Sequence, residues 1–226
     1  MNRGKGFHAS YVYSEIKRRI ITLELKPGEI LDEKQLMSEL KVGRTPIREA
    51  LLMLKNENLI VSLPNKSAYV KELTLKDVKD LSEALMNIER LTASLAAQRI
   101  TSEGLNEIKK VGEEIEGVVS RKDYWEIESQ NRVFHQLIAK ACGNRYLISI
   151  HENLRNEISR LSYLAFSKDF NNNPTLEEHF NKVIDHHREM IACLGKRDAE
   201  KLGDLAVDHI RLFQSRITLY LSHYFS

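Results

Sequence analysis

Long apolar runs are absent from this 226-residue chain, and cysteine is scarce. No stretch approaches the roughly 18 consecutive apolar residues of a transmembrane helix, and no hydrophobic segment of an export signal follows the first residues. We therefore expect no membrane partner and a cytoplasmic location. The two cysteines, Cys142 and Cys193, are isolated in apolar helical contexts, so we expect buried free thiols without a disulfide.

Motifs of common enzymes are also missing. The chain contains no glycine-rich phosphate loop, nucleophile elbow or paired-carboxylate motif, so we expect no enzymatic activity. The net charge is only +2, but it is uneven: residues 1–73 carry 13 Lys and Arg against 9 Asp and Glu, and the remainder carries 21 against 23. A mildly basic amino-terminal part suits a polyanion, although many of these charges can be plain solvated surface.

Two arginines mark the start of a predicted helix. Arg44 and Arg48 are four residues apart and project from one face of that helix. Pro46 suits a first helical position, and Thr45 just before it can cap the helix. A planar guanidinium group can bind guanine O6 and N7 together, or a phosphate. The opposite face is predicted to dock on a core through Ile47, Leu51, Leu52 and Leu54.

The elements around this basic helix predict a winged helix-turn-helix. A surface helix rich in arginine can be ordinary, but here the order of helix, helix, turn, basic helix and hairpin favours a DNA reader. The predicted elements are a helix over Tyr11–Leu23, a helix over Asp32–Leu40, a turn at Lys41–Gly43, and strands at Leu59–Leu63 and Ala68–Val70 joined by a turn at Pro64–Ser67.

From Leu75 onward the pattern is helical almost throughout. Breaks near residues 101, 120, 143, 171–173 and 195–198 divide this part into six helices. We therefore expect a mostly α fold: a winged helix-turn-helix domain with a small β-hairpin wing over residues 8–73, then an all-α six-helix bundle over residues 74–226.

Three histidines of this bundle form a candidate metal site. His135 follows Asn131 by four residues, so both lie on one helix face. His187 and His209 lie on the last two helices and would face each other in an antiparallel helical hairpin. Three imidazoles and an oxygen ligand suit a divalent transition metal such as zinc, nickel or manganese. The alternative is that these residues are hydrogen-bonded core histidines.

Three segments resemble a known family. Leu25–Leu31, Gly43–Leu51 and Glu57–Ile60 resemble the DNA-binding domain of the GntR superfamily, and the helical remainder is similar to its FadR-type branch with an FCD effector domain. The resemblance implies a homodimeric, ligand-responsive transcription factor that binds a partly palindromic double-stranded DNA operator. The residues that it implies for operator contact are Lys34, Arg44, Thr45 and Arg48, with Asn65 and Lys66 at the tip of the wing.

The resemblance also bears on the metal site. Asn131–His135 is similar to the Asp-x-x-Phe-His motif of the FCD domain, and the spacing of His187 and His209 matches its remaining ligands. In this chain the amide of Asn131 replaces a carboxylate, which predicts weaker metal binding. Leu85 stands where the family often has an arginine for a carboxylate effector, and Gly43 stands in place of a serine.

These patterns predict a sequence-specific transcriptional regulator, expected to be a repressor, whose operator binding is modulated by a small acidic metabolite with help from a metal. One alternative is a helical interaction module with a DNA-binding head and no response to ligand or metal. A metal-dependent hydrolase is disfavoured because no general base or nucleophile accompanies the histidines.

Overall fold

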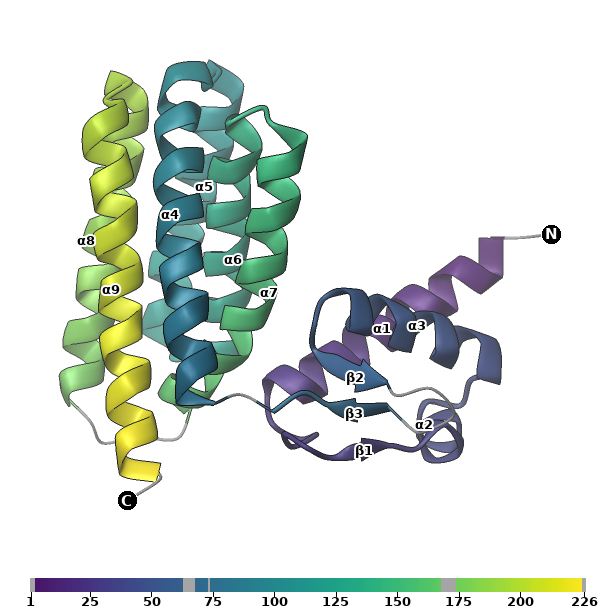
Figure 1. The fold of residues 1–226 in the computed structure, drawn as a ribbon. Coiled ribbons are helices and arrows are strands. Elements are labelled where there is room, and N and C mark those ends of the chain that lie inside the picture. Colours follow the sequence, from purple (N-terminus) through teal and green to yellow (C-terminus); the bar gives the residue numbers. More distant parts are fainter. Residues whose placement is uncertain (1–2, 63–67, 73, 168–173, 225–226) are drawn as a thin grey trace. The chain divides into compact units, whose positions relative to one another are not determined.

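The computed structural model describes residues 3–62, 68–72, 74–167 and 174–224 (Figure 1). The chain divides into two compact units, Met1–Thr74 and Leu75–Ser226. Among the described residues, every helix is too short or too polar to cross a lipid bilayer.

The first unit contains three helices and three short strands in its described residues. The strands form one antiparallel sheet in the order β1-β3-β2, with Val61 opposite Tyr69. The predicted hairpin is thus confirmed as β2 and β3, while its turn, with Asn65 and Lys66, lies outside the described residues. The elements are α1 (Arg3–Ile21), β1 (Ile30–Leu31), α2 (Glu33–Leu40), α3 (Arg44–Asn56), β2 (Ile60–Ser62) and β3 (Ala68–Val70).

Strand β1 was not predicted. It pairs with β3 through Ile30 opposite Tyr69, and the turn before it is fixed by a hydrogen bond from the Gly28 N–H to the Val70 carbonyl at 2.8 Å. Gly28 has a φ of +79°, a left-handed conformation that glycine adopts without strain. A two-residue strand leaves almost no alternation in the sequence, so only tertiary pairing defines it.

Helix α3 begins two residues earlier than the proline pattern indicated. Gly43 is its N-cap, without a side-chain hydrogen bond, so the predicted capping role of Thr45 is wrong. Pro46 is instead the third helical residue, where a missing N–H costs nothing because the first four N–H groups have no partner within a helix. A Cβ at Gly43 would meet no atom within 4 Å, so a serine would fit there as well.

The core of the first unit lies between α1 and α3, which pack on each other. The inward residues of α3 are Ile47, Ala50, Leu51 and Leu54. The prediction that Leu52 faces inward is wrong, because its residue is 59% exposed. Leu52 follows Arg48 by four residues and therefore shares the outer face of the helix.

The second unit is a bundle of helices that run side by side (Figure 1). Its described residues form six helices, the predicted number, and confirm the breaks near residues 101, 120, 143 and 195–198, while the predicted break at 171–173 lies outside the described residues. Helices α4 and α9 pack along each other, and alanines of α4 permit their close approach. Cys142 and Cys193 are buried and free, as predicted. The helices are α4 (Leu75–Arg99), α5 (Ser102–Arg121), α6 (Tyr124–Ala141), α7 (Arg145–Ser167), α8 (Pro174–Lys196) and α9 (Ala199–Tyr224).

Candidate DNA-reading surface and candidate metal centre

The outer face of α3 carries the predicted DNA-contacting residues. Arg44, Thr45 and Arg48 are all exposed at the first turns of this helix, while its opposite face is held in the core. Lys34 is exposed on the first turn of α2, where its backbone N–H donates to the Asp32 carboxylate at 2.7 Å. The first turns of α2 and α3 therefore present one lysine and two arginines to solvent.

A carboxylate that was not predicted as a site residue lies between the two helices. Arg48 Nε donates to Glu33 Oε2 at 3.1 Å and to Oε1 at 3.3 Å, and Arg44 Nε lies 3.9 Å from Glu33 Oε2. Glu33 is the first residue of α2, and in the sequence it is simply an acidic residue at the positive end of a helix. Its position across the turn depends on the angle between α2 and α3, which the residue spacing does not give.

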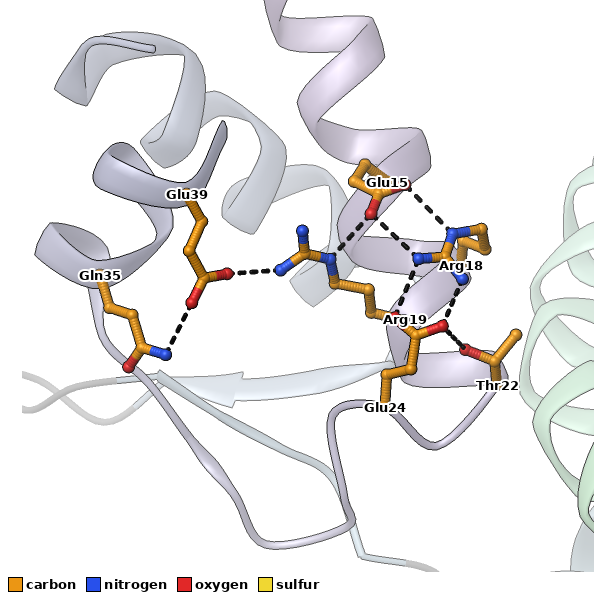
Figure 2. A network of polar contacts seen from close by, with 7 residues as sticks. All are labelled: Glu15, Arg18, Arg19, Thr22, Glu24, Gln35 and Glu39. Carbon is orange, nitrogen blue, oxygen red and sulfur yellow. Dashed lines mark hydrogen bonds and ion pairs between the residues drawn. The ribbon is translucent and has the colours of Figure 1, made fainter. Parts of the chain in front are cut away.

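Arg18 and Arg19 of α1 form ion pairs with carboxylates instead (Figure 2). Glu15 accepts hydrogen bonds from both Arg18 and Arg19, at 3.0 Å and 2.8 Å, and raises the pKa of both guanidinium groups. Arg19 also donates to Glu39 of α2 at 2.6 Å. Glu24 accepts a hydrogen bond from Arg18 at 2.9 Å. This network ties α1 to α2 and pairs both Arg18 and Arg19 with carboxylates.

Three predicted metal ligands meet inside the second unit. His135 of α6, His187 of α8 and His209 of α9 are buried, and one ring nitrogen from each lies within 4.8 Å of the others. Nε2 of His135 lies 3.2 Å from Nε2 of His209. Asn131 lies one turn before His135 on α6 and is 9% exposed. The structure thus brings the imidazoles of three helices to one point.

The protonation and partners of these side chains fit a cation. Burial lowers the pKa of His135 to about 4 and holds the pKa values of His187 and His209 well below the ordinary value, so all three rings are neutral at pH 7. Among the described residues, both ring nitrogens of His187, Nδ1 of His209 and Oδ1 of Asn131 are buried without a hydrogen-bond partner. Buried polar atoms rarely stay unpaired, and neutral imidazole is the form that binds metals.

A buried carboxylate that the sequence did not single out lies behind His135. Glu89 of α4 is 3.7 Å from His135 Nδ1, accepts a hydrogen bond from Arg155 Nε at 2.6 Å, and lies 2.9 Å from His151 Nε2. Burial raises the pKa of Glu89, but the charge of Arg155, with His151 and His135, outweighs burial, so the pKa lies well below its ordinary value. Glu89 is therefore ionised in the interior of the helical unit.

A small apolar cavity adjoins Asn131. Its volume of about 20 Å³ is space for about one water molecule, so a metabolite would enter only if the surrounding rings moved. Leu85, where the resembling family often has an arginine, is fully buried. The main lining residues are Tyr124, Ile127, Asn131, Phe180, Val183 and Phe213.

Comparisons with known proteins match both units. The family model of the FCD domain matches residues 80–212, and that of bacterial regulatory proteins, gntR family, matches residues 8–70. Similar relatives include the uncharacterized HTH-type transcriptional regulator YdhC of Bacillus subtilis, 29% identical over 78% of this chain and 81% of its own length. The gluconate operon transcriptional repressor of Bacillus licheniformis is 26% identical over 84% of this chain and 76% of its own length.

Solved structures share the fold. The chain of E. coli McbR/YncC superposes with a TM-score of 0.79 at 23% identity, covering 96% of this chain and 98% of that chain. A putative GntR transcriptional regulator from Rhodococcus sp. RHA1 gives a TM-score of 0.68 at 18% identity, covering 93% and 97%. At these identities the likeness extends to the fold alone.

Proposed function

The chain belongs to the GntR family of bacterial regulatory proteins and carries an FCD domain, and from this premise we propose that it is a repressor that binds a specific DNA operator in the cytoplasm. The observation that carries the proposal is that Arg44, Thr45 and Arg48 are exposed together on the first turns of α3, the helix that follows the turn after α2. Similar relatives are named transcriptional repressors, which supports the direction of control.

The proposed operator is a double-stranded, partly palindromic site that a homodimer binds, because two-fold symmetric regulators bind two-fold symmetric sites. Arg44 and Arg48 would read base edges in the major groove, with Thr45 between them. Lys34 would contact phosphate and set the register of the protein on the duplex. Asn65 and Lys66 remain predicted DNA contacts of the wing, and Lys66 is the one expected to contact phosphate.

Replacing Arg44 by alanine is expected to weaken operator binding by about 1–3 kcal/mol and to relax preference at one base pair. The operator is first obtained by selecting bound duplexes from a random pool with the wild-type protein. Affinities for it and for its single-base variants are then measured at fixed salt. Arg121→Ala on α5 removes the same charge from an exposed site in the second unit and serves as the control. Binding by Arg44→Ala as tight and selective as wild type would refute the assignment.

We propose that the helical unit senses a small acidic metabolite with help from a metal. His135, His187 and His209 would hold zinc, nickel or manganese, with the Asn131 amide oxygen as a fourth ligand. Such an ion supplies a positive centre that an anionic group of the effector can bind. The apolar cavity beside Asn131 would enlarge to take the carbon skeleton, and differential affinity for two arrangements of the dimer would change operator occupancy.

Metal affinity is expected to rise about tenfold or more in Asn131→Asp, because a carboxylate adds a negative charge to a set of neutral ligands, and to be lost in His187→Ala. Metal content of the purified protein and competition with a chromophoric chelator measure both effects. His186→Ala alters the adjacent residue and is the control, expected to bind like wild type. If wild type, Asn131→Asp and His187→Ala are all free of metal, the proposed metal site is refuted. A helical module without ligand response is then favoured.

A further inference from the structure

We propose that Glu33 is a specificity-determining residue that makes the arginines of α3 favour base edges over bare phosphates. The proposal rests on the DNA-reading function above and adds to it a residue that does not itself need to touch DNA. It starts from the position of the Glu33 carboxylate, which lies against Arg48 and near Arg44 across the turn between α2 and α3.

The contact fixes which edge of Arg48 is free. Both Glu33 oxygens accept from Nε of Arg48, at 3.1 Å and 3.3 Å. Within the described part of the chain, the two terminal nitrogens of this guanidinium group make no hydrogen bond, and the Arg48 side chain is 62% exposed. The two parallel N–H groups at the free end are the pair that can bind guanine O6 and N7 together. Glu33 thus orients Arg48 while leaving its reading edge open.

The charge of Glu33 acts differently on the two possible targets. A phosphate that approaches Arg48 or Arg44 also approaches the carboxylate and is repelled by it. A guanine edge offers neutral acceptors, so the same carboxylate costs it much less. Specificity is the difference between the binding free energies for two DNA sequences. A group that weakens the competing phosphate contact therefore raises the ratio of operator affinity to the affinity for unrelated DNA. The cost to operator binding is smaller than the cost to binding of unrelated DNA.

The same unit offers a contrast in Arg18 and Arg19. Their guanidinium groups each contact two carboxylates, and their side chains are 33% and 20% exposed. Arg44 and Arg48 share a single carboxylate, and their side chains are 56% and 62% exposed. The first pair is committed to structure, whereas the second keeps most of its surface for a ligand. An exposed pair of this kind adds little to folding, so Glu33 can be replaced without unfolding the unit.

The test compares Glu33→Gln with Glu49→Gln in the full-length protein. Glu49 is exposed on α3 directly after Arg48, and its replacement changes the net charge equally without touching the Arg48 contact. Binding to the selected operator and to a scrambled duplex of equal length is measured by fluorescence anisotropy at fixed salt. Glu33→Gln is expected to bind the scrambled duplex about five- to tenfold more tightly and the operator at most about twofold more tightly. Glu49→Gln is expected to tighten both duplexes alike.

Two results would overturn the proposal: equal changes in the specificity ratio for the two variants, or a loss of operator affinity in Glu33→Gln with the scrambled duplex unchanged. The latter would make Glu33 a mere support for Arg48. Failure of the DNA-reading function itself is a separate result, since the wild-type protein would then bind operator and scrambled duplex equally. Unchanged denaturation midpoints of the variants confirm that folding is not the cause.

Discussion

Replacing Glu89 by alanine is expected to lower the free energy of unfolding of the helical unit by about 3–5 kcal/mol, the cost of breaking a buried ion pair by removing one partner. The residues of Glu89 and Arg155 are 2% and 4% exposed, so the change leaves a guanidinium charge without its carboxylate in the interior. His151 loses its contact with the carboxylate as well. Urea denaturation followed through the fluorescence of Trp125, the single tryptophan and a residue of α6, measures the effect on this unit.

Two further variants separate charge from general damage to α4. Glu83→Ala removes an exposed carboxylate from the same helix and is expected to change stability by less than about 0.5 kcal/mol. The double variant Glu89→Met with Arg155→Met is expected to recover much of the loss, because a buried pair can be replaced by apolar side chains at little cost. A Glu89→Ala protein as stable as wild type would show that the cluster does not hold the helices together.

The residues on the outer face of α3 could largely be predicted, because the helical periodicity determines which side chains share a face. Arg44 and Arg48 at a spacing of four must share a face, and the burial of Ile47, Leu51 and Leu54 leaves that face outward. The same spacing should have placed Leu52 with Arg48, but hydrophobicity alone assigned it to the core. The cap of α3 was misplaced because proline is tolerated at several positions of the first helical turn, so its presence does not fix the first residue.

The candidate metal centre could be predicted in part. The spacing of His187 and His209 on either side of the break before α9 brings their rings together when the two helices pair. Glu89 could not be found in this way, because a single glutamate in a helix gives no sign of the angle at which α4 crosses α6 and α7. The contact of Glu33 with Arg48 could not be predicted for the same reason. Local spacing predicts which residues share a face, whereas contacts across helices depend on packing.

Lowering the pH from 7 to 4 is expected to destabilise the metal-free helical unit by several kcal/mol. Burial lowers the pKa of His179 to about 4, with Arg216 adding to the effect, and burial lowers that of His135 to about 4. In the unfolded chain these rings take up protons near pH 6.5, so the unfolded state binds more protons and stability falls with pH. The loss begins near pH 6.5 and levels off below about pH 4, at roughly 3 kcal/mol for each residue. His187 and His209 act in the same direction.

Urea midpoints from Trp125 fluorescence, measured at half-unit steps between pH 7 and pH 4, test this expectation. His179→Phe removes one titrating ring and should make the midpoint fall less steeply, although overpacking could shift the whole curve. Excess zinc should raise the urea midpoint by more near pH 6 than near pH 4.5, because metal and protons compete for the same ring nitrogens. A midpoint independent of pH over this range would mean that the folded and unfolded states take up protons equally, so that the buried rings titrate near pH 6.5. That result would contradict the pKa values of about 4 for His135 and His179.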